Sequence, residues 1–405
     1  MFVEAALKNG ASVCIVDEKP SEDLVNYYND RTIVLVKDSI KALQDLATYK
    51  RNLYNIPVVA VTGSVGKTST KDIIASVLSK KYNVLKTEGN FNNHIGLPLT
   101  ILKLKDHTAL VVEMGMNHFG EISLLTNIAK PTIAVITNIG TSHIGNLGSR
   151  ENILKAKLEI LEGLSSDGKI VINNDNDLLH QWAQSVDNKN LITYGIENIS
   201  SYMAKNIIEN SNETNYKINI EDTKYNVKVP VIGMHFVYNS LCAIAVGKTL
   251  GIDMKECING ILDFKLTSKR MDFIKIKNNV TVLADFYNAS YDSMKSALEV
   301  VKSYKAERKI AVLGDMLELG EFSEELHKKV GQEVYKNNID ILVTVGTLAK
   351  NIANEANRLG IKEIYICDNN KDAIDILNNI IKNDDIILLK ASNAMKFGEI
   401  LDGIS

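Results

Sequence analysis

The segment from Val58 to Lys71 constrains this chain more than any other. A β-branched apolar run leads into a turn bracketed by Gly63 and Gly66, and a helical pattern begins at Lys67. A strand that ends in such a turn directs successive backbone N–H groups and the N-terminus of a helix toward one point. An ordinary strand-to-helix turn is the alternative, which the flanking strand and helix patterns disfavour. The segment therefore predicts a phosphate-binding loop.

This loop is a short variant, with Val61 where the generic pattern has its first glycine. Lys67 would add a positive charge beside the phosphates, and the Thr68 hydroxyl can coordinate Mg²⁺. We therefore expect ATP or GTP to bind here. The residues expected to contact the nucleotide are Gly63, Ser64, Val65, Gly66, Lys67, Thr68 and Ser69.

Composition narrows the class of protein. The 405 residues can form two or three domains, and with a net charge of −3 and no basic stripe we expect no nucleic-acid partner. The four cysteines are far apart and form no Cys-x-x-Cys pair, so we expect free thiols in the reducing cytoplasm. Because no segment has the roughly 18 consecutive apolar residues of a membrane span, we also expect a soluble protein.

Strand-like apolar runs alternate with helical sequence along most of the chain. This alternation predicts an α/β fold whose sheets are mostly parallel, with helices on both faces. In the middle of the chain, the strand-like runs are 58–61, 109–113, 133–137 and 169–173. After residue 265 the alternation restarts, as in a Rossmann-like domain, at 280–285, 309–314, 341–345, 363–368 and 385–390.

A small α/β domain is expected before the phosphate-binding loop. Its elements are short strands at 11–17 and 32–36 and an amphipathic helix at 39–49. The chain is thus expected to have three domains. They comprise an N-terminal domain at 1–52, a central nucleotide-binding domain at 53–267 and a C-terminal Rossmann-like domain at 268–405.

Polar residues follow two predicted strands at the sheet edge where open α/β sheets bind ligands. Glu113 ends one strand, where a carboxylate can hold the magnesium ion of a nucleotide, and His143 follows the next. Loop hydrogen bonding is the alternative role for both residues, and their shared position favours a site. Lys157 lies on a predicted helix. Taken alone, it would be interpreted as an exposed surface lysine.

A set of ordered motifs spans nearly the whole chain. They lie at Thr62–Lys71, Gly89–Pro98, Glu113–Asn117, Thr141–Gly145, Gly233–Ala243, Asp285–Met294 and Val312–Gly320, the last followed by His327. Together they resemble the motifs of the Mur ligases, which form amide bonds in peptidoglycan synthesis at the expense of ATP. The resemblance implies a ligase with a phosphate-binding central domain.

The C-terminal motifs are similar to those of the family member that joins D-alanyl-D-alanine to UDP-N-acetylmuramoyl-tripeptide. In this family, a substrate carboxylate attacks the γ-phosphate of ATP to give an acyl phosphate, and an incoming amine then displaces phosphate. The resemblance therefore implies these small-molecule substrates, with ADP and phosphate as products. We expect the enzyme to act as a monomer.

The resemblance also implies a site for two magnesium ions. Thr68 and Glu113 would hold the first ion, and His143 would bind the second. Lys67 would neutralise the phosphates during the reaction. The expected catalytic residues are Lys67, His143 and Lys157.

Lys157 matches a family lysine that reacts with CO₂ to become a carbamate. The carbamylated side chain would be a carboxylate-like ligand for the second magnesium ion. Lys155 is the competing candidate, but the Ala156-Lys157 pair preserves the alanine–lysine pair of the family. We therefore favour Lys157.

Further nucleotide contacts follow from the same resemblance. His235 and Asn239, one helical turn apart, would face the adenine, although a buried histidine and a helix cap would otherwise be expected. Arg270 would reach the nucleotide, with an interdomain salt bridge as the alternative. Asn288 and Asp292 would close over ATP from the C-terminal domain.

The region that would bind the UDP-linked substrate is the least complete match. Asn92 and Asn93 match a segment that faces this substrate, although turn formation alone would also explain them. The chain opens in what resembles the middle of the family's N-terminal domain. We therefore expect residues 1–52 to be a remnant that lacks most of the uridine-diphosphate pocket.

Two C-terminal segments depart from the family pattern. Ser290-Tyr291 stands where relatives have Asn-Pro, which removes a proline that fixes the local turn. Asn393 stands where relatives commonly carry an arginine, so no guanidinium is available there to bind a carboxylate or phosphate. Recognition of the dipeptide is therefore expected to be weaker or different.

Two other functions remain open. Another Mur-type amide ligase, such as a folylpolyglutamate or cyanophycin-synthesis relative, would share the loop and the metal ligands but should lack the runs at 287–288 and 314–318. A nucleotide-binding protein that has lost ligase activity would bind ATP without forming product.

Overall fold

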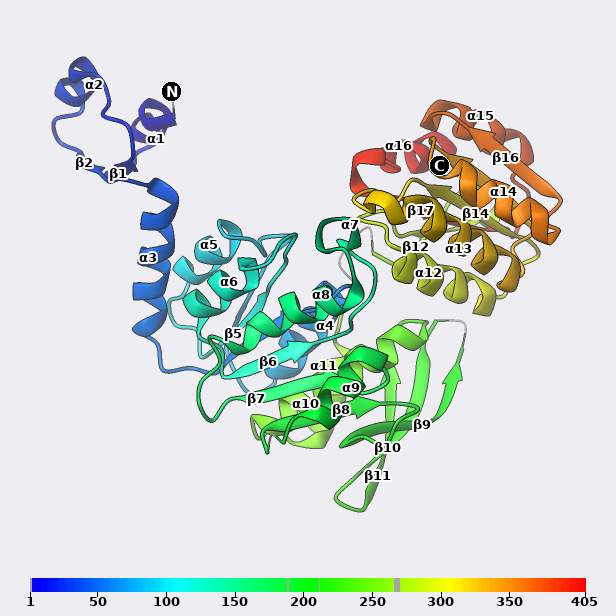
Figure 1. Ribbon diagram of the computed structural model, residues 1–405, viewed down its shortest axis with the longest axis horizontal. Coiled ribbons are helices and arrows are strands. Elements are labelled where there is room, and N and C mark those ends of the chain that lie inside the picture. The colour runs from blue at the N-terminus through cyan, green and yellow to red at the C-terminus, as the bar shows by residue number, and fades with distance from the viewer. Residues whose placement is uncertain (1, 188, 211, 266–269) are drawn as a thin grey trace.

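The computed structural model describes residues 2–187, 189–210, 212–265 and 270–405. Its strands form a two-stranded, a nine-stranded and a six-stranded sheet, and helices pack against the two larger sheets (Figure 1). We call the parts built around the nine- and six-stranded sheets the central unit and the C-terminal unit. Among the described residues, no helix has the length and apolar character needed to cross a membrane.

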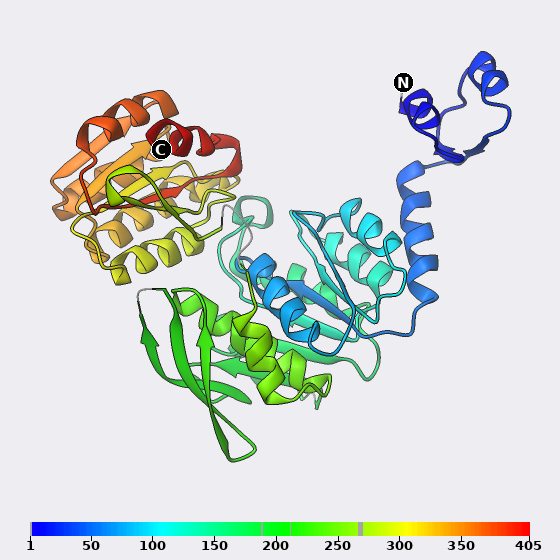
Figure 2. The ribbon, with the colours of Figure 1, turned by 180° about the vertical axis from the view of Figure 1, so that it is seen from behind.

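The N-terminal elements project away from the rest of the molecule (Figures 1 and 2). Strand β1 (Val13–Val16) pairs in parallel with β2 (Thr32–Leu35), beside α1 (Phe2–Lys8) and α2 (Glu22–Tyr27). Helix α3 (Ser39–Asn52) then leads into the central unit, where the buried Arg51 guanidinium donates a 2.7 Å hydrogen bond to the Ala129 carbonyl.

The nine-stranded sheet has the order β11-β10-β9-β8-β7-β6-β3-β5-β4. All neighbouring strands from β4 to β9 are parallel, whereas β9, β10 and β11 are antiparallel. The strands are β3 (Val58–Thr62), β4 (Val84–Lys86), β5 (Ala109–Glu113), β6 (Ile133–Ile136), β7 (Lys169–Asn173), β8 (Leu191–Gly195), β9 (Tyr202–Glu209), β10 (Thr214–Ile220) and β11 (Thr223–Val229). Every residue of β3, β5 and β6 is buried, as expected for parallel strands covered on both faces.

Helices of the central unit connect these strands and cover them. They are α4 (Lys67–Leu78), α5 (Gly96–Leu102), α6 (Glu121–Ala129), α7 (Ile144–Leu147), α8 (Arg150–Leu158), α9 (Asp177–Ser185), α10 (Met234–Thr249) and α11 (Met254–Leu262). Helix α10 packs against α4 and α11, and α3 packs against α5 and α6. The phosphate-binding loop therefore lies between a buried strand, β3, and a largely buried helix, α4.

The six-stranded sheet has the order β12-β13-β17-β14-β15-β16, in which only the edge strand β12 is antiparallel to its neighbour. The strands are β12 (Asp272–Lys275), β13 (Thr281–Ala284), β14 (Lys309–Gly314), β15 (Ile341–Val345), β16 (Glu363–Cys367) and β17 (Ile386–Lys390). The helices are α12 (Tyr291–Ser303), α13 (Ser323–Lys336), α14 (Lys350–Leu359), α15 (Asn370–Ile380) and α16 (Gly398–Ile404). The predicted α/β class with mostly parallel sheets is confirmed.

The C-terminal unit meets the central unit at α7 (Figures 1 and 2). The short 3-10 helix η3 (Gly320–Phe322) packs against α7. A Cβ on Gly145 of α7 would lie 2.6 Å from both the Glu318 carbonyl oxygen and the Gly320 nitrogen, so the two backbones touch with no room for a side chain. The loops that follow β6 and β14 therefore line one cleft.

Candidate active site

Two glycines shape the phosphate-binding loop. Gly63 has φ +151°, and a Cβ there would lie only 1.9 Å from Oγ1 of Thr137, just after β6. Gly66 precedes α4 with a left-handed backbone, φ 80°. A side chain at Gly63 would force the loop away from the sheet, so both positions favour glycine.

Asn138 holds the loop from the neighbouring strand end. Its carbonyl accepts a 3.0 Å hydrogen bond from the Ser64 N–H, and its side-chain Oδ1 accepts one of 3.0 Å from the Val65 N–H. The first backbone hydrogen bond of α4 runs from Thr70 N to Gly66 O. The N–H groups at 67–69 precede that bond and lack helical partners, as phosphate binding requires.

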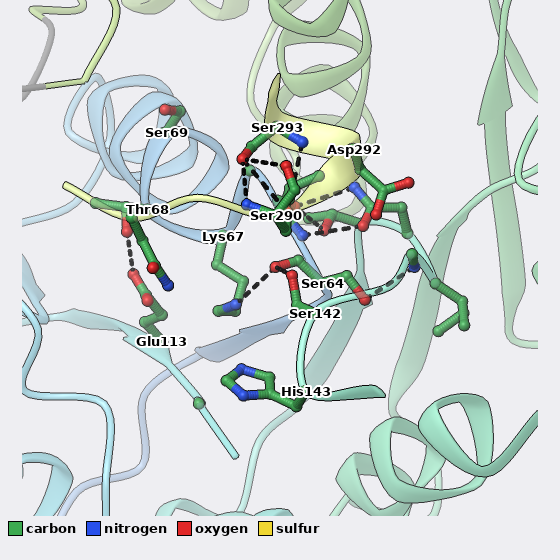
Figure 3. A pocket seen from close by; sticks show the side chains of 18 of the residues that line it. Ser64, Lys67, Thr68, Ser69, Glu113, Ser142, His143, Ser290, Asp292 and Ser293 are labelled. Carbon is green, nitrogen blue, oxygen red and sulfur yellow. Dashed lines mark hydrogen bonds between the residues drawn. The ribbon is translucent and has the colours of Figure 1, made fainter. Parts of the chain in front are cut away.

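Lys67, Thr68 and Glu113 meet at the start of α4 (Figure 3). The Lys67 ammonium donates a 2.7 Å hydrogen bond to the Gly63 carbonyl, back across the loop. The Thr68 hydroxyl donates a 2.8 Å hydrogen bond to Glu113 Oε2, and the Asn92 amide donates one of the same length to Oε1. A hydroxyl and a carboxylate oxygen thus lie side by side, which is a suitable donor set for Mg²⁺ that also keeps water or phosphate ligands.

His143 lies across from this group, at the start of α7 (Figure 3). Its backbone is left-handed, with φ 65°, and Nδ1 is buried without a hydrogen-bond partner among the described residues. The nearest carboxylate oxygen, Glu318 Oε2, is 3.2 Å from this nitrogen. Burial and the nearby Lys67 and Lys157 cations lower the pKa of His143 to about 3, so the imidazole is neutral and free to bind a metal.

Lys157 and Lys155 occupy opposite environments on α8. Lys157 is 1% exposed, whereas Lys155 is exposed. Burial and the Lys67 cation hold the pKa of Lys157 well below its usual range. Lys157 makes no hydrogen bond or ion pair with the described residues. Burying such an amine costs folding free energy, so Lys157 is a better candidate for a functional role than the exposed Lys155.

His235 and Asn239 on α10 have unused polar atoms. His235 Nε2 and Asn239 Nδ2 are buried and lack hydrogen-bond partners among the described residues. Asn239 Oδ1 accepts a 2.9 Å hydrogen bond from the Thr70 hydroxyl, which ties α10 to α4. Burial lowers the pKa of His235 to about 4, so its ring is neutral. A neutral ring nitrogen and an amide are suited to the edge of a nucleobase.

Arg270 and Tyr287 form a stacked pair at the junction with the C-terminal unit. The Arg270 guanidinium carbon lies 4.0 Å from the centre of the Tyr287 ring. Both side chains line the same cavity. The observed partner of Arg270 is therefore an aromatic ring, a cation–π contact in place of the salt bridge considered as an alternative.

Asp292 reaches from α12 into the central unit. Its Oδ2 accepts hydrogen bonds from both the Thr141 N–H, at 2.7 Å, and the Thr141 hydroxyl, at 2.9 Å. Gly140 makes room for it, because a Cβ there would lie 2.3 Å from the same oxygen. Asn288 uses Oδ1 for its own loop, accepting from the Ala289 N–H at 2.9 Å.

Asn93 supports the turn interpretation that its sequence left open. Its Oδ1 accepts hydrogen bonds from the Ile95 and Gly96 N–H groups, at 3.1 and 2.8 Å, at the start of α5. Asn92 instead orients Glu113, as described above. Both asparagines still line the main cavity.

One cavity of about 1200 Å³ collects most of these residues. It is lined by every residue predicted to lie in the site except Gly63 and Lys157. Gly63 and Lys157 are both buried. Lys157 is still close enough to the site to lower the pKa of His143, and Lys67 in turn lowers the pKa of Lys157. Among the described residues, no group of three or more His, Cys, Asp or Glu side chains forms a metal cluster.

Sequence reasoning did not single out three residues that the fold brings to this site. Asn138 fixes the phosphate-binding loop through its bonds to the Ser64 and Val65 N–H groups. Tyr287 reaches Arg270 because β12 pairs with β13, which brings the residues before β12 close to those after β13. Glu318 reaches His143 because the C-terminal unit packs against α7. The sequence around Tyr287 and Glu318 does not indicate which residues they contact.

The departure at Ser290-Tyr291 preserves the local geometry. Ser290 is the N-cap of α12, and its hydroxyl and that of Ser293 form a reciprocal capping box. Tyr291 then occupies the first helical position, which tolerates proline but does not need it. The start of α12 is therefore capped without the proline, since serine caps the helix as asparagine would.

Comparison with known proteins decides the family. Models of the Mur ligase middle domain and of the Mur ligase glutamate ligase domain match residues 61–247 and 269–393. The UDP-N-acetylmuramoyl-tripeptide–D-alanyl-D-alanine ligase of Bacillus subtilis is 40% identical over 404 residues, covering 99% of this chain and 86% of the relative. The chain belongs to the Mur ligase family. The predicted resemblance is therefore confirmed.

Solved structures agree with this Mur ligase assignment. MurF from Acinetobacter baumannii matches with a TM-score of 0.91 at 28% identity, covering 100% of this chain and 87% of that one. MurF from Thermotoga maritima in complex with ADP matches with a TM-score of 0.87 at 30% identity, covering 100% and 90%. The chain is a MurF-type, ATP-dependent carbon–nitrogen ligase.

Proposed function

We propose that this Mur ligase joins D-alanyl-D-alanine to UDP-N-acetylmuramoyl-tripeptide, with conversion of ATP to ADP and phosphate. The main support is the similarity to the Bacillus subtilis UDP-N-acetylmuramoyl-tripeptide–D-alanyl-D-alanine ligase, which is 40% identical over 99% of this chain. The cavity supports it, because phosphate-binding and base-binding groups line one continuous space.

The first step is attack of the tripeptide carboxylate on the γ-phosphate of ATP. A bond forms between a carboxylate oxygen and phosphorus, and the bond to the β-phosphate oxygen breaks, which releases ADP. Lys67 and the N–H groups at 67–69 bind the phosphates and offset their charge. His235 and Asn239 hold the adenine, and Arg270 steers the nucleotide toward the loop.

The second step is attack of the dipeptide amine on the acyl phosphate. A carbon–nitrogen bond forms, phosphate leaves, and the amine loses a proton. The negative charge that develops on the tetrahedral intermediate lies near Lys67, inside a cleft closed by Asp292 and Thr141.

Two magnesium ions fit the side chains present. Thr68 and Glu113 would hold the first, and the unpartnered Nδ1 of His143 would be a ligand for the second. When bound, the ions neutralise phosphate charge and polarise the reacting oxygens. Lys157 would complete the second site as a carbamate, since a buried lysine with a lowered pKa is readily present as the uncharged amine that CO₂ requires.

We further propose that the enzyme is a cytoplasmic monomer. All four cysteines are buried free thiols, as expected in a reducing compartment. The substrates are small molecules, and one cavity of this chain is lined by the proposed site residues other than Gly63 and Lys157.

The experiment that tests this function is ADP release by the purified chain with ATP, Mg²⁺, UDP-muramoyl tripeptide and D-alanyl-D-alanine, omitting each in turn. Sustained release that needs both substrates supports the proposal. Release with glutamate and a folate or peptide acceptor instead would favour the other Mur-type ligases. Tight ATP binding without release for any acceptor would identify a protein that has lost ligase activity.

A further inference from the structure

A buried lysine follows the phosphate-binding loop, and the function proposed above gives it no role. Lys71 lies on α4, three residues after Thr68, and is 2% exposed. Its ammonium donates a 2.6 Å hydrogen bond to the Thr87 carbonyl and lies 3.2 Å from Asp72 Oδ1. These contacts offset the cost of burying a charged amine, and they fix the Thr87 peptide group relative to α4.

Thr87 connects Lys71 to Glu113. It directly follows β4 and is fully buried, and its N–H donates a 3.0 Å hydrogen bond to the Val111 carbonyl on β5. In a regular parallel ladder, the Thr87 carbonyl would next accept the Glu113 N–H. Here the carbonyl accepts from the Lys71 ammonium, and the Thr87 hydroxyl accepts the Glu113 N–H at 3.0 Å. The end of β5 is therefore held by a side chain in place of the backbone.

The hydrogen bonds between α4 and Glu113 form a closed circuit. Thr68 holds the Glu113 carboxylate directly, at 2.8 Å. Lys71 holds the Glu113 backbone through Thr87. Thr68 and Lys71 lie on the same side of the helix, because they are three residues apart. All four residues are at most 3% exposed, so water competes little for these bonds.

Asp72 keeps Lys71 in place. The Asp72 side chain is 4% exposed, and its Oδ1 accepts a 2.6 Å hydrogen bond from the Lys86 ammonium. Lys86 ends β4 and immediately precedes Thr87. The same carboxylate oxygen therefore faces one ammonium group from α4 and one from β4, which holds the helix and the strand together beside Thr87.

We propose that Lys71 and Thr87 are positioning residues for the magnesium ligand Glu113. The proposal rests on the function proposed above, in which Thr68 and Glu113 hold the first magnesium ion. By fixing the backbone at the end of β5, Lys71 and Thr87 keep the carboxylate beside the Thr68 hydroxyl. Loss of either contact should therefore weaken magnesium binding, while the loop still binds the nucleotide phosphates. A role in packing alone would instead lower stability and leave magnesium binding unchanged.

The test compares Thr87→Val with Thr87→Ser by calorimetric titration of ADP, once with Mg²⁺ and once with EDTA. Valine has the shape of threonine without the hydroxyl, whereas serine keeps the hydroxyl. Thr87→Val should lower the ADP affinity in Mg²⁺ about tenfold or more, as loss of a partner of a metal ligand does, and leave it unchanged in EDTA. Thr87→Ser should behave as the wild type. Mn²⁺ binding to the ADP complex, followed by electron paramagnetic resonance, should weaken in the valine variant alone.

Lys71→Met tests the other end of the connection. It removes the ammonium group, keeps a long side chain and should reproduce the magnesium-specific loss. Thr281→Val is the matched control, because Thr281 is a buried threonine in β13 of the C-terminal unit whose hydroxyl lies 3.2 Å from that of Tyr304. It should change neither affinity. Urea unfolding of each variant measures any loss of stability separately.

The results for the variants and for the wild type test different claims. Wild-type ADP release that needs neither the tripeptide nor the dipeptide would overturn the proposed function. Equal losses of ADP affinity in Mg²⁺ and EDTA for Thr87→Val would overturn only the positioning role, because the hydroxyl would then support the loop as a whole. Unchanged affinities in both Thr87→Val and Lys71→Met, or an equal loss in Thr87→Ser and Thr87→Val, would overturn it as well.

Discussion

The Thr68 hydroxyl donates a 2.8 Å hydrogen bond to Glu113, joining the first turn of α4 to the end of β5. The Asn92 amide holds the other carboxylate oxygen at the same distance. Glu113 is therefore fixed with both oxygens beside the phosphate-binding loop, and its position depends on three separate segments of the chain.

Glu113→Gln should weaken magnesium binding while preserving the hydrogen bond from Thr68. The expected loss of Mg²⁺ affinity is at least the roughly 10–100-fold that follows removal of a partner of a metal ligand. The measurement is ADP release as a function of Mg²⁺ concentration. Glu88→Gln, on an exposed carboxylate paired with Lys103, is the control, and an equal loss there would contradict a specific role for Glu113.

Lys157→Ala should remove most activity, because the carbamate ligand for the second magnesium cannot form. Short carboxylates such as acetate should restore part of it without added bicarbonate by entering the space of the missing side chain. The exposed Lys155→Ala variant should keep wild-type activity. Full activity of Lys157→Ala would exclude the carbamate, and loss in Lys155→Ala would move the role to that residue.

Tyr287→Leu should raise the KM for ATP by removing the ring on which Arg270 stacks. A cation–π contact contributes about 0.5–2 kcal/mol, so we expect a change of about 2- to 30-fold. Tyr287→Phe keeps the ring and should behave as the wild type. If the phenylalanine and leucine variants lose affinity equally, the hydroxyl rather than the stacking is responsible.

Acidification should destabilise the fold through His235, whose pKa burial lowers to about 4. The unfolded chain binds a proton near the ordinary histidine pKa of about 6.5, whereas the folded state does not, so stability falls as the pH drops from about 6.5 toward 4. We expect a loss of about 2 kcal/mol at pH 5 from this residue. Urea unfolding at pH 7.5 and pH 5 measures it.

His235→Gln is the matched variant for that measurement. It removes the titrating group, so its stability should change less between the two pH values than that of the wild type. His143, with a pKa lowered to about 3, should leave a residual pH dependence in both proteins. Equal slopes in the two proteins would show that His235 does not titrate differently on folding.

Most of the parallel strands were predictable because each is a short, continuous apolar run, whereas β4 and β8 were not predicted. The runs at 109–113, 169–173, 309–314 and 341–345 match β5, β7, β14 and β15 residue for residue. The antiparallel strands β9 to β11 were not predicted. They alternate buried and exposed residues and carry many lysines and asparagines, so their apolar signal is diluted.

Local sequence determined the phosphate-binding loop, the strands around it and the family of the enzyme, because each depends on residues close together in the chain. Tertiary structure decided which lysine of α8 is buried, since adjacent helical positions face different surroundings and only packing selects one. It also decided that Tyr287 reaches Arg270 and that Glu318 reaches His143. The Tyr287 contact depends on the pairing of β12 with β13, and the Glu318 contact exists only where the C-terminal unit meets Gly145 of the central unit. No short stretch of sequence encodes either relation.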